Sequence, residues 1–263
     1  MISELVSFIL GVVEGLTEFL PISSTAHLLV SEKILKLESS HFLNFYTIFI
    51  QLGAILAVPF LYFKRLIRSF KIYNYIIISF VPAVVFGVLL DDFLESLFSG
   101  YWFIAISWFL GGIVLLNIDQ WIKATPQSLD LEEELSIAKS IKIGLFQCIA
   151  MIPGVSRSGA TIIGGRIQGL SHTNAVEFSF LLAIPTILGA SCKKILDYRS
   201  ELEAFTQMDN LVILLIGFGV SFIIAIITIK WMVHFISKNG FKFFGYYRII
   251  AAIFLTIYLI WSR

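Results

Sequence analysis

Long apolar stretches without an acidic or basic residue constrain this chain more than any other feature. Four of them are Ser39–Phe63, Ile72–Leu90, Ser96–Ile118 and Asn210–Ile229. The hydrocarbon core of a bilayer requires about 17 to 25 apolar residues per helix, so each stretch is long enough to cross a membrane. Two further stretches reach this length if one charge is tolerated in each, at Glu177 and at Arg248.

The composition agrees with a membrane protein. Hydrophobic residues make up 58% of the 263 residues and charged residues 14%, with a mean hydropathy of +0.90. An ordinary soluble domain is about 45–50% apolar and about 25% charged, so this chain has too little charge to cover a soluble globule. A soluble enzyme and a disordered protein are excluded. The net charge of +1 also excludes a nucleic-acid binder that works through a basic surface.

We therefore predict an all-α polytopic membrane protein with six spans near residues 43–63, 73–90, 101–118, 174–192, 211–229 and 244–261. A basic cluster follows the first span, at Lys64, Arg65, Arg68 and Lys71. An acidic cluster follows the second, at Asp91, Asp92 and Glu95. The positive-inside rule assigns the basic joint to the cytoplasm and the acidic joint to the outer side. Alternation then predicts a cytoplasmic connector at 119–140 and both termini on the outer side.

Two further segments, 2–36 and 138–172, are apolar but do not fit the span pattern. Each is interrupted by a polar loop that contains proline and serine, around Pro21–Ser24 and Pro153–Ser158. Proline interrupts the hydrogen-bond ladder of a helix, and serine competes for its backbone groups. Irregular backbone at membrane depth is tolerated only inside protein or beside a water-filled cavity. We therefore predict two re-entrant helix-loop-helix hairpins.

The two hairpins resemble copies of one unit. Pro21 and Pro153 are 132 residues apart, as are Ser24 and Ser156, and three predicted spans follow each hairpin. An odd number of spans inverts the second copy, as in inverted-repeat membrane proteins whose broken helices meet near the bilayer centre. We predict a single integral membrane domain over 1–263, with repeats at about 1–120 and 138–263 joined by the connector.

Glu14 and Glu18 are ionisable residues at membrane depth, where charge is costly and indicates function. Their spacing of four residues places both carboxylates on one helix face, where they repel each other. The pair indicates a divalent metal ion, a shared proton or an arginine partner. A solvated helix face is the alternative, although the preceding run Leu5–Val13 is apolar.

The first loop continues with Ser23, Ser24, Thr25 and His27. If Thr25 opens the second half-helix, Ser24 lies near the N-cap and His27 in the first turn, so that a serine and an imidazole can approach each other. For either serine taken singly, a helix cap is the simpler interpretation. His27 taken singly also fits a packed core histidine.

The second loop carries Arg157, and arginine binds phosphate oxygens as a planar fork. Hydroxyl and backbone N–H groups surround it in the sequence, at Gly154, Ser156, Ser158 and Gly159. A helix that starts near Gly159 would add its N-terminal dipole. The loop is therefore a candidate oxyanion cradle, with a membrane-interface anchor as the alternative. Glu177 either joins this site or pairs with Arg166.

Together the loops offer carboxylates, an imidazole, hydroxyls and a guanidinium in one membrane cavity. This set fits hydrolysis of a lipid phosphate, in which Arg157 holds the anion, a serine or water attacks, and a base takes the proton. The inverted repeat with broken helices also fits a transporter that moves a lipid phosphate across the bilayer.

At these residues the sequence closely resembles the bacterial undecaprenyl-diphosphate phosphatase family, also known for bacitracin resistance. The resemblance extends over nearly the whole chain and rests on the runs Glu14–His27, Gln51–Gly53, Pro153–Thr161 and Glu177–Ala183. It implies removal of the terminal phosphate from C55 isoprenyl diphosphate, which recycles the lipid carrier of peptidoglycan synthesis. The phosphatidic-acid phosphatase group is faintly similar at Pro21–His27, but its upstream Lys/Arg-Pro motif is absent here.

By match to the family motifs, the resemblance implies that Glu14 and Glu18 form the acidic pair and that Arg157 binds the diphosphate. It implies Ser24 as the candidate nucleophile and His27 as the acid/base, while His27 itself and water stay open as nucleophiles. The candidate substrate-binding set adds Ser23, Thr25, Gly154, Ser156, Ser158 and Gly159. One departure is Ala26, where the family usually has glycine; we expect a helical position there, which suits alanine.

The resemblance further implies a divalent cation, Mg²⁺ or Ca²⁺, for which Glu14 and Glu18 are the candidate ligands. It implies the bacterial cytoplasmic (inner) membrane and a site that faces the outer side. The expected partners are the membrane and a polyprenyl diphosphate lipid, with no nucleic acid. A homodimer is compatible with the sequence, which leaves the oligomeric state open.

Overall fold

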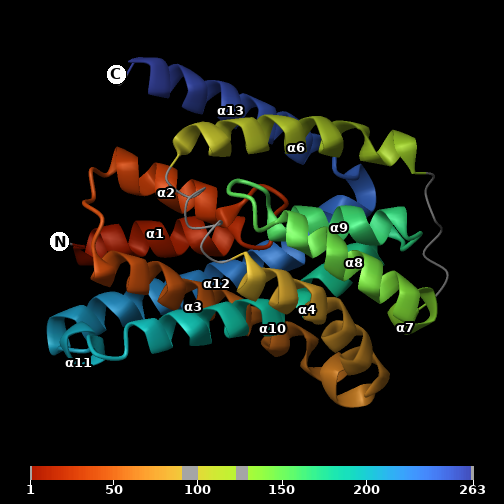
Figure 1. Cartoon of the computed structure of the whole chain (residues 1–263), viewed down its shortest axis with the longest axis horizontal. Helices are drawn as coiled ribbons and strands as arrows, with labels where there is room; N and C mark the ends of the chain where they lie inside the picture. Colours follow the sequence, from red (N-terminus) through yellow and green to blue (C-terminus); the bar gives the residue numbers. More distant parts are fainter. Residues whose placement is uncertain (1, 91–99, 123–129, 262–263) are drawn as a thin grey trace.

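The computed structural model describes residues 2–90, 100–122 and 130–261, and all regular structure in these ranges is helical (Figure 1). The helices are α1 (Glu4–Thr17), α2 (Ser24–Ile34), α3 (His41–Arg68), α4 (Lys71–Leu89), α6 (Tyr101–Trp121), α7 (Leu131–Glu134), α8 (Ile137–Ile149), α9 (Arg157–Ile167), α10 (His172–Asp197), α11 (Leu202–Phe205), α12 (Met208–Asn239) and α13 (Lys242–Trp261). The predicted all-α fold is confirmed.

Six of these helices are long and apolar enough to cross a membrane: α3, α4, α6, α10, α12 and α13. They correspond one for one to the six predicted spans, which are thereby confirmed. The acidic joint at Asp91, Asp92 and Glu95 lies outside the described residues, as does the central part of the connector, 123–129.

Serine side chains begin several of the helices. Ser3, Ser40, Ser136, Ser156 and Ser171 each accept a hydrogen bond from the backbone N–H three residues ahead. Such caps satisfy one of the N–H groups that a helix leaves free at its start. Short polar serine-containing joints thus end one apolar helix and begin the next.

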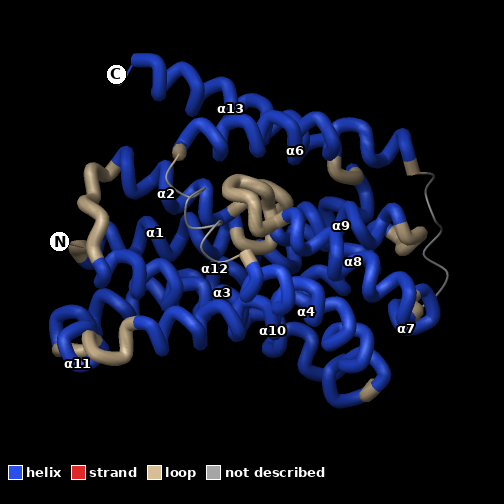
Figure 2. The backbone as a smooth tube through the Cα atoms, viewed as in Figure 1, coloured by secondary structure: helices blue, strands red, loops and turns tan. Residues whose placement is uncertain are grey.

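The two broken segments form helix-loop-helix pairs, α1 with α2 and α8 with α9. Figure 2 shows their loops at the centre of the molecule, between the helices. A helix of 14 residues, the length of α1, extends about 21 Å, which is shorter than a bilayer core of about 30 Å. The pairs are compatible with the predicted re-entrant hairpins, and the inverted repeat stays a prediction.

The joints predicted on the cytoplasmic side gather at one end of the molecule. Arg65, after the first span, contacts Glu132 of α7. Asp119, at the end of α6, accepts hydrogen bonds from His172 at the start of α10 and from the backbone N–H of Phe241 before α13. His41, the first residue of α3, pairs with Glu201, just before α11. In Figure 1, α11, the start of α1 and the end of α13 lie at the opposite end of the molecule. Alternation of the spans is therefore observed, and the assignment of either end to the cytoplasm stays a prediction.

Close helix contacts position α1, which carries the acidic pair. Gly15 faces α12 so closely that a Cβ atom there would lie 2.7 Å from the carbonyl oxygen of Ser221. Small residues allow such approach between membrane helices, where packing is the main source of association. The face of α1 that bears Glu14 is therefore turned into the protein, and Glu14 is fully buried.

Candidate active site

The loops of the two hairpins meet in the centre of the protein. The hydroxyls of Ser156 and Ser158 both donate to the carbonyl oxygen of Leu20, at 3.3 and 2.8 Å. From the other side, the buried guanidinium of Arg248 on α13 donates to the carbonyl oxygens of Pro21 and Gly154, at 3.2 and 3.1 Å. Residues more than a hundred positions apart are thus held in one site, as the paired hairpins predicted.

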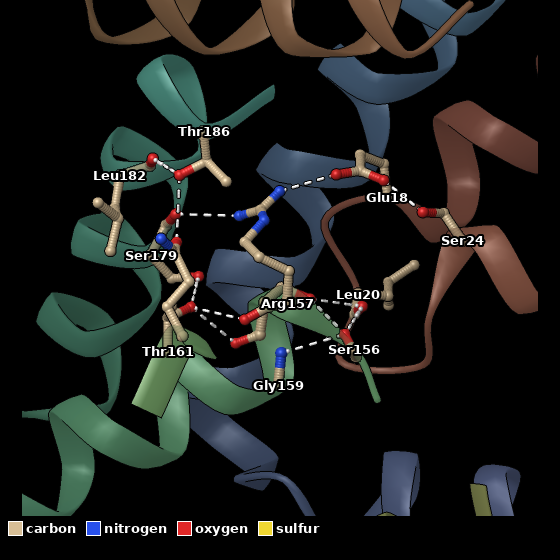
Figure 3. A network of polar contacts seen from close by, with 12 residues as sticks. Glu18, Leu20, Ser24, Ser156, Arg157, Gly159, Thr161, Ser179, Leu182 and Thr186 are labelled. Atoms are coloured by element: carbon tan, nitrogen blue, oxygen red, sulfur yellow. Dashed lines mark hydrogen bonds and ion pairs between the residues drawn. The ribbon is translucent and has the colours of Figure 1, made fainter. Parts of the chain in front are cut away.

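An ion pair joins the two motifs across this junction (Figure 3). Nη2 of Arg157 lies 2.8 Å from Oε1 of Glu18, and Nη1 donates to the carbonyl oxygen of Ser179 at 3.1 Å. Both side chains are largely buried. Of the three arrangements proposed for the acidic pair, an arginine partner is the one formed by Glu18.

Ser24 completes this chain of contacts, because its hydroxyl donates to Oε2 of Glu18. It is the first residue of α2, and Ser23 stands at the cap position with a φ of 72° and no side-chain cap bond. A non-glycine residue with positive φ is strained, and such strain gathers at functional sites. Ser24 is therefore oriented toward a carboxylate rather than used as a cap. A hydroxyl bonded to a base is the usual form of an activated nucleophile.

His27, one turn after Ser24 on α2, does not line the cavity between the hairpins. Its Nδ1 lies 2.7 Å from the carbonyl oxygen of Ser23, which can only accept, so Nδ1 carries the hydrogen. Its Nε2 lies 2.7 Å from the hydroxyl of Tyr247, and its ring packs against Trp108. The approach of His27 to Ser24 considered from the sequence is not formed here, and its acid/base role stays a prediction.

Glu14 has no hydrogen-bond donor among the described residues for either carboxyl oxygen. The ionisable side chains that interact with Glu14 are Glu18, which directly follows the end of α1, and Arg157. A fully buried carboxylate without a partner is costly, so the site is suited to a proton or a cation beside Glu14. Magnesium ions are commonly held by one or two carboxylates together with substrate phosphates. Glu18 lines the cavity described below, whereas Glu14 does not, and no group of three or more His, Cys, Asp or Glu side chains within the described residues offers a complete metal site.

A cavity of about 230 Å³ lies between the hairpins and helices α3, α4 and α10. Its polar lining comes from Glu18, Ser23, Ser24, Thr25, Gln51, Gln147, Ser156, Arg157 and Thr186. At roughly 30 Å³ for each water, this space suits a phosphate group with a few waters, and it is too small for a long lipid.

Gln147 and Thr186 were missed by the sequence reasoning. The hydroxyl of Thr186 donates to the carbonyl oxygen of the Gln147 side chain at 3.2 Å. Nε2 of Gln147 is buried beside the cavity and has no hydrogen-bond partner among the described residues. Gln147 lies three residues after Gly144, just as Glu18 lies three residues after Gly15, and this matching interval is the sequence signal that could have indicated it.

Three other residues singled out from the sequence have a role in the local backbone structure. Gly154 has a φ of +82°, a conformation that favours glycine. Ser156 caps α9 by accepting from the backbone N–H of Gly159, and Ala26 lies inside α2, as expected.

Glu177 pairs with Arg65, at 2.7 Å between Oε1 and Nη1. It does not line the cavity, so the structure does not place it in the site. Arg65 is a partner that the sequence did not indicate. The residues are 112 positions apart, and their contact depends on how α3 packs on α10.

Comparisons with known proteins agree with the resemblance seen in the motifs. The family model "Bacitracin resistance protein BacA" matches residues 7–254. The chain is 47% identical over 255 residues to the undecaprenyl-diphosphatase of Flavobacterium johnsoniae, covering 97% of this chain and 96% of the relative. It is 44% identical to the undecaprenyl-diphosphatase of Aquifex aeolicus, in an alignment that covers 95% of this chain and 96% of the relative. It is 40% identical to the undecaprenyl-diphosphatase of Bdellovibrio bacteriovorus, in an alignment that covers 98% of this chain and 96% of the relative.

Proposed function

Because the chain belongs to the bacitracin resistance protein BacA family, we propose that it is a membrane phosphatase that hydrolyses undecaprenyl diphosphate to undecaprenyl phosphate and inorganic phosphate. The observation that carries the proposal is the chain of contacts from Arg157 through Glu18 to Ser24. It brings an anion-binding group, a base and a hydroxyl into one cavity that is surrounded by apolar helices.

Arg157 is the group that binds the terminal phosphate. Its guanidinium offers a planar fork that matches two phosphate oxygens and stays charged at any physiological pH. The Ser179 carbonyl and Glu18 orient that fork before substrate arrives. As negative charge moves onto the phosphoryl oxygens during the reaction, a preorganised cation stabilises the transition state without further rearrangement.

Glu18 and Ser24 supply the nucleophilic step. The Ser24 oxygen attacks the terminal phosphorus, its proton passes to Glu18, and the bond from phosphorus to the bridging oxygen breaks. The lipid monophosphate leaves, and water then cleaves the phosphoserine to release inorganic phosphate and restore the serine. Direct attack by a water held by Glu18 gives the same products in one step. Only the serine route forms a phosphoserine, so detection of that intermediate distinguishes the two routes.

Glu14 and Glu18 are the residues that would hold a divalent cation, Mg²⁺ or Ca²⁺. Such an ion would neutralise charge on the two phosphates of the substrate. Glu14 is buried without a donor among the described residues, and either a cation or a proton shared with Glu18 would compensate its charge.

The proposal includes a place in the bacterial cytoplasmic membrane, with the site facing the outer side and the product recycled for peptidoglycan synthesis. Bacitracin resistance follows if the enzyme removes the diphosphate lipid. The comparisons give the transporter alternative no support, and a homodimer stays a proposal without a contact that favours it.

The test is phosphate release from C55 isoprenyl diphosphate by purified protein in detergent, with and without a chelator. We expect turnover that EDTA abolishes and Mg²⁺ or Ca²⁺ restores. Full activity of the Arg157→Ala variant would remove the proposed site, and absence of release by the wild-type protein would remove the function. Arg68→Ala, at an exposed basic residue far from the cavity, is the matched control.

A further inference from the structure

A second cavity, of about 460 Å³, lies between α6 on one side and α8 and α9 on the other. Its lining is almost wholly apolar, with Leu110 and Val114 from α6, Phe146 and Ile149 from α8, and Ala160 and Ile163 from α9. It exists because α6 packs along α13 and has no extensive packing with α8 or α9 (Figure 1). We call this cavity the apolar groove.

The apolar groove adjoins the polar cavity of the active site. Val155 and Ser156 line both spaces, so the loop before α9 is their common wall. Arg157, the proposed phosphate-binding residue, is the next residue in the chain. A molecule with a charged head and an apolar tail can therefore place its head at Arg157 and its tail in the groove.

The outer wall of the groove is open to the surroundings of the protein. Ile106, Leu110 and Ile149 are exposed, at 54%, 56% and 47% of their surface. Because α6 is a membrane-spanning helix, this opening faces lipid, and an amphiphile can enter sideways from the bilayer. At the inner end of the groove, the guanidinium of Arg248 donates four hydrogen bonds to backbone carbonyl oxygens. Most of its N–H groups are therefore paired within the protein and do not make the groove polar.

We infer that the apolar groove binds the isoprene units nearest the diphosphate of the substrate, and that it sets the preference for a substrate with an isoprenoid tail over one with almost none. The inference rests on the proposed function and adds the location of the tail. The volume is in the range that holds drug-sized ligands, well below the size of a 55-carbon chain. The remainder of the tail therefore stays among the lipids. Because the tail enters from an apolar medium, its binding in the groove depends on van der Waals contacts with the lining rather than on removal from water.

The first test compares kcat/KM for C55 isoprenyl diphosphate with that for a five-carbon prenyl diphosphate, which has almost no tail. Leu110→Trp and Ala160→Leu fill the groove from α6 and from α9. We expect each to lower the ratio of the two kcat/KM values, because tail units that no longer fit lose their van der Waals contacts with the groove while the five-carbon compound is unaffected. Leu215→Trp, at an equally exposed apolar position on α12, is the matched control and leaves the ratio unchanged.

An unchanged ratio in both groove variants overturns the inference, whether their two activities fall together or stay normal. A wild-type protein that hydrolyses neither compound refutes the proposed function instead, so the two failures are distinguishable.

A second measurement does not depend on the folding of a variant. A C55 diphosphate analogue with a photoreactive group on its second isoprene unit is cross-linked to wild-type protein in detergent, and the labelled peptides are sequenced. We expect label on α6 and on α8 or α9, suppressed by excess unlabelled C55 monophosphate. Label confined to α4 and α10, which border the polar cavity from the other side, or label that the competitor does not reduce, would overturn the inference.

Discussion

Arg248 holds the two active-site loops together, and its replacement is the sharpest test of the site's construction. Its side chain is 3% exposed and donates to carbonyl oxygens of Pro21, Gly154, Ser107 and Trp108. The last two belong to α6, whereas the first two are loop groups. A hydrogen bond from a charged donor contributes about 1.5–3 kcal/mol, so the two loop bonds restrain the site by about 3–6 kcal/mol.

Arg248→Met removes all four donors, and we expect the loops to separate or shift. If about half of the restraint acts on the alignment of Ser24, Glu18 and Arg157, kcat/KM falls by about 10- to 100-fold, at 1.36 kcal/mol for each factor of ten. Arg248→Lys keeps the charge but lacks the planar fork, so its loss is expected to be intermediate. The assay is phosphate release from C55 diphosphate, read as kcat and KM separately, with thermal unfolding in detergent measured in parallel.

Gly111 provides an independent perturbation of the same contact. A Cβ atom at this position would lie 2.4 Å from Nη2 of Arg248, so Gly111→Ala displaces the guanidinium without removing it. Gly219 on α12 has nothing within 4 Å of such an atom, which makes Gly219→Ala the matched control. The reasoning is refuted if Arg248→Met turns over at the wild-type rate, or if the two glycine variants are indistinguishable.

Three further predictions concern the cavity and the buried charges. Ser24→Ala is expected to lower kcat by about 10²- to 10⁴-fold, the usual contribution of a positioned catalytic group, and to abolish a trappable phosphoenzyme; normal turnover means that water attacks directly. Gln147→Leu removes the unpartnered Nε2 donor beside the cavity and is expected to raise KM by up to about tenfold, the value of one hydrogen bond; an unchanged KM excludes contact with the substrate. Arg65→Gln leaves Glu177 unpaired and is expected to lower the free energy of unfolding by about 2 kcal/mol, less than for a fully buried pair, while the Arg65→Gln and Glu177→Gln double variant recovers most of the loss. Unchanged stability in the single variant would contradict a stabilising role for the Arg65–Glu177 pair.

Local patterns in the sequence predict the helical membrane fold and the polar residues of the site. Six spans follow from run length alone, because a bilayer selects helices by their hydrophobic length. The proline and serine interruptions around Pro21 and Pro153 indicated the helix-loop-helix pairs, and their chemistry indicated an anion site at Arg157. These features depend on residues near each other in the chain, which is why sequence reasoning reached them.

Side-chain partners across the molecule were beyond that reasoning. Arg248 was noted only as a charge that its span must tolerate, yet it joins both loops. His27 was considered beside Ser24, yet it faces Tyr247. Both outcomes depend on the rotation of α2 and α13 about their axes, and hydropathy does not report that rotation for helices that are apolar on most faces.

The sequence by itself determined that the chain spans a membrane six times, that two segments are broken, and which polar groups those breaks contain. Only the tertiary structure decided that Arg157 pairs with Glu18, that Glu177 pairs with Arg65, and that an apolar groove adjoins the polar cavity. The physical reason is the distance along the chain over which each interaction acts. Helix formation and membrane insertion depend on neighbouring residues, whereas ion pairs and cavities depend on how separate helices pack, and single close contacts such as that of Gly15 with α12 set that packing.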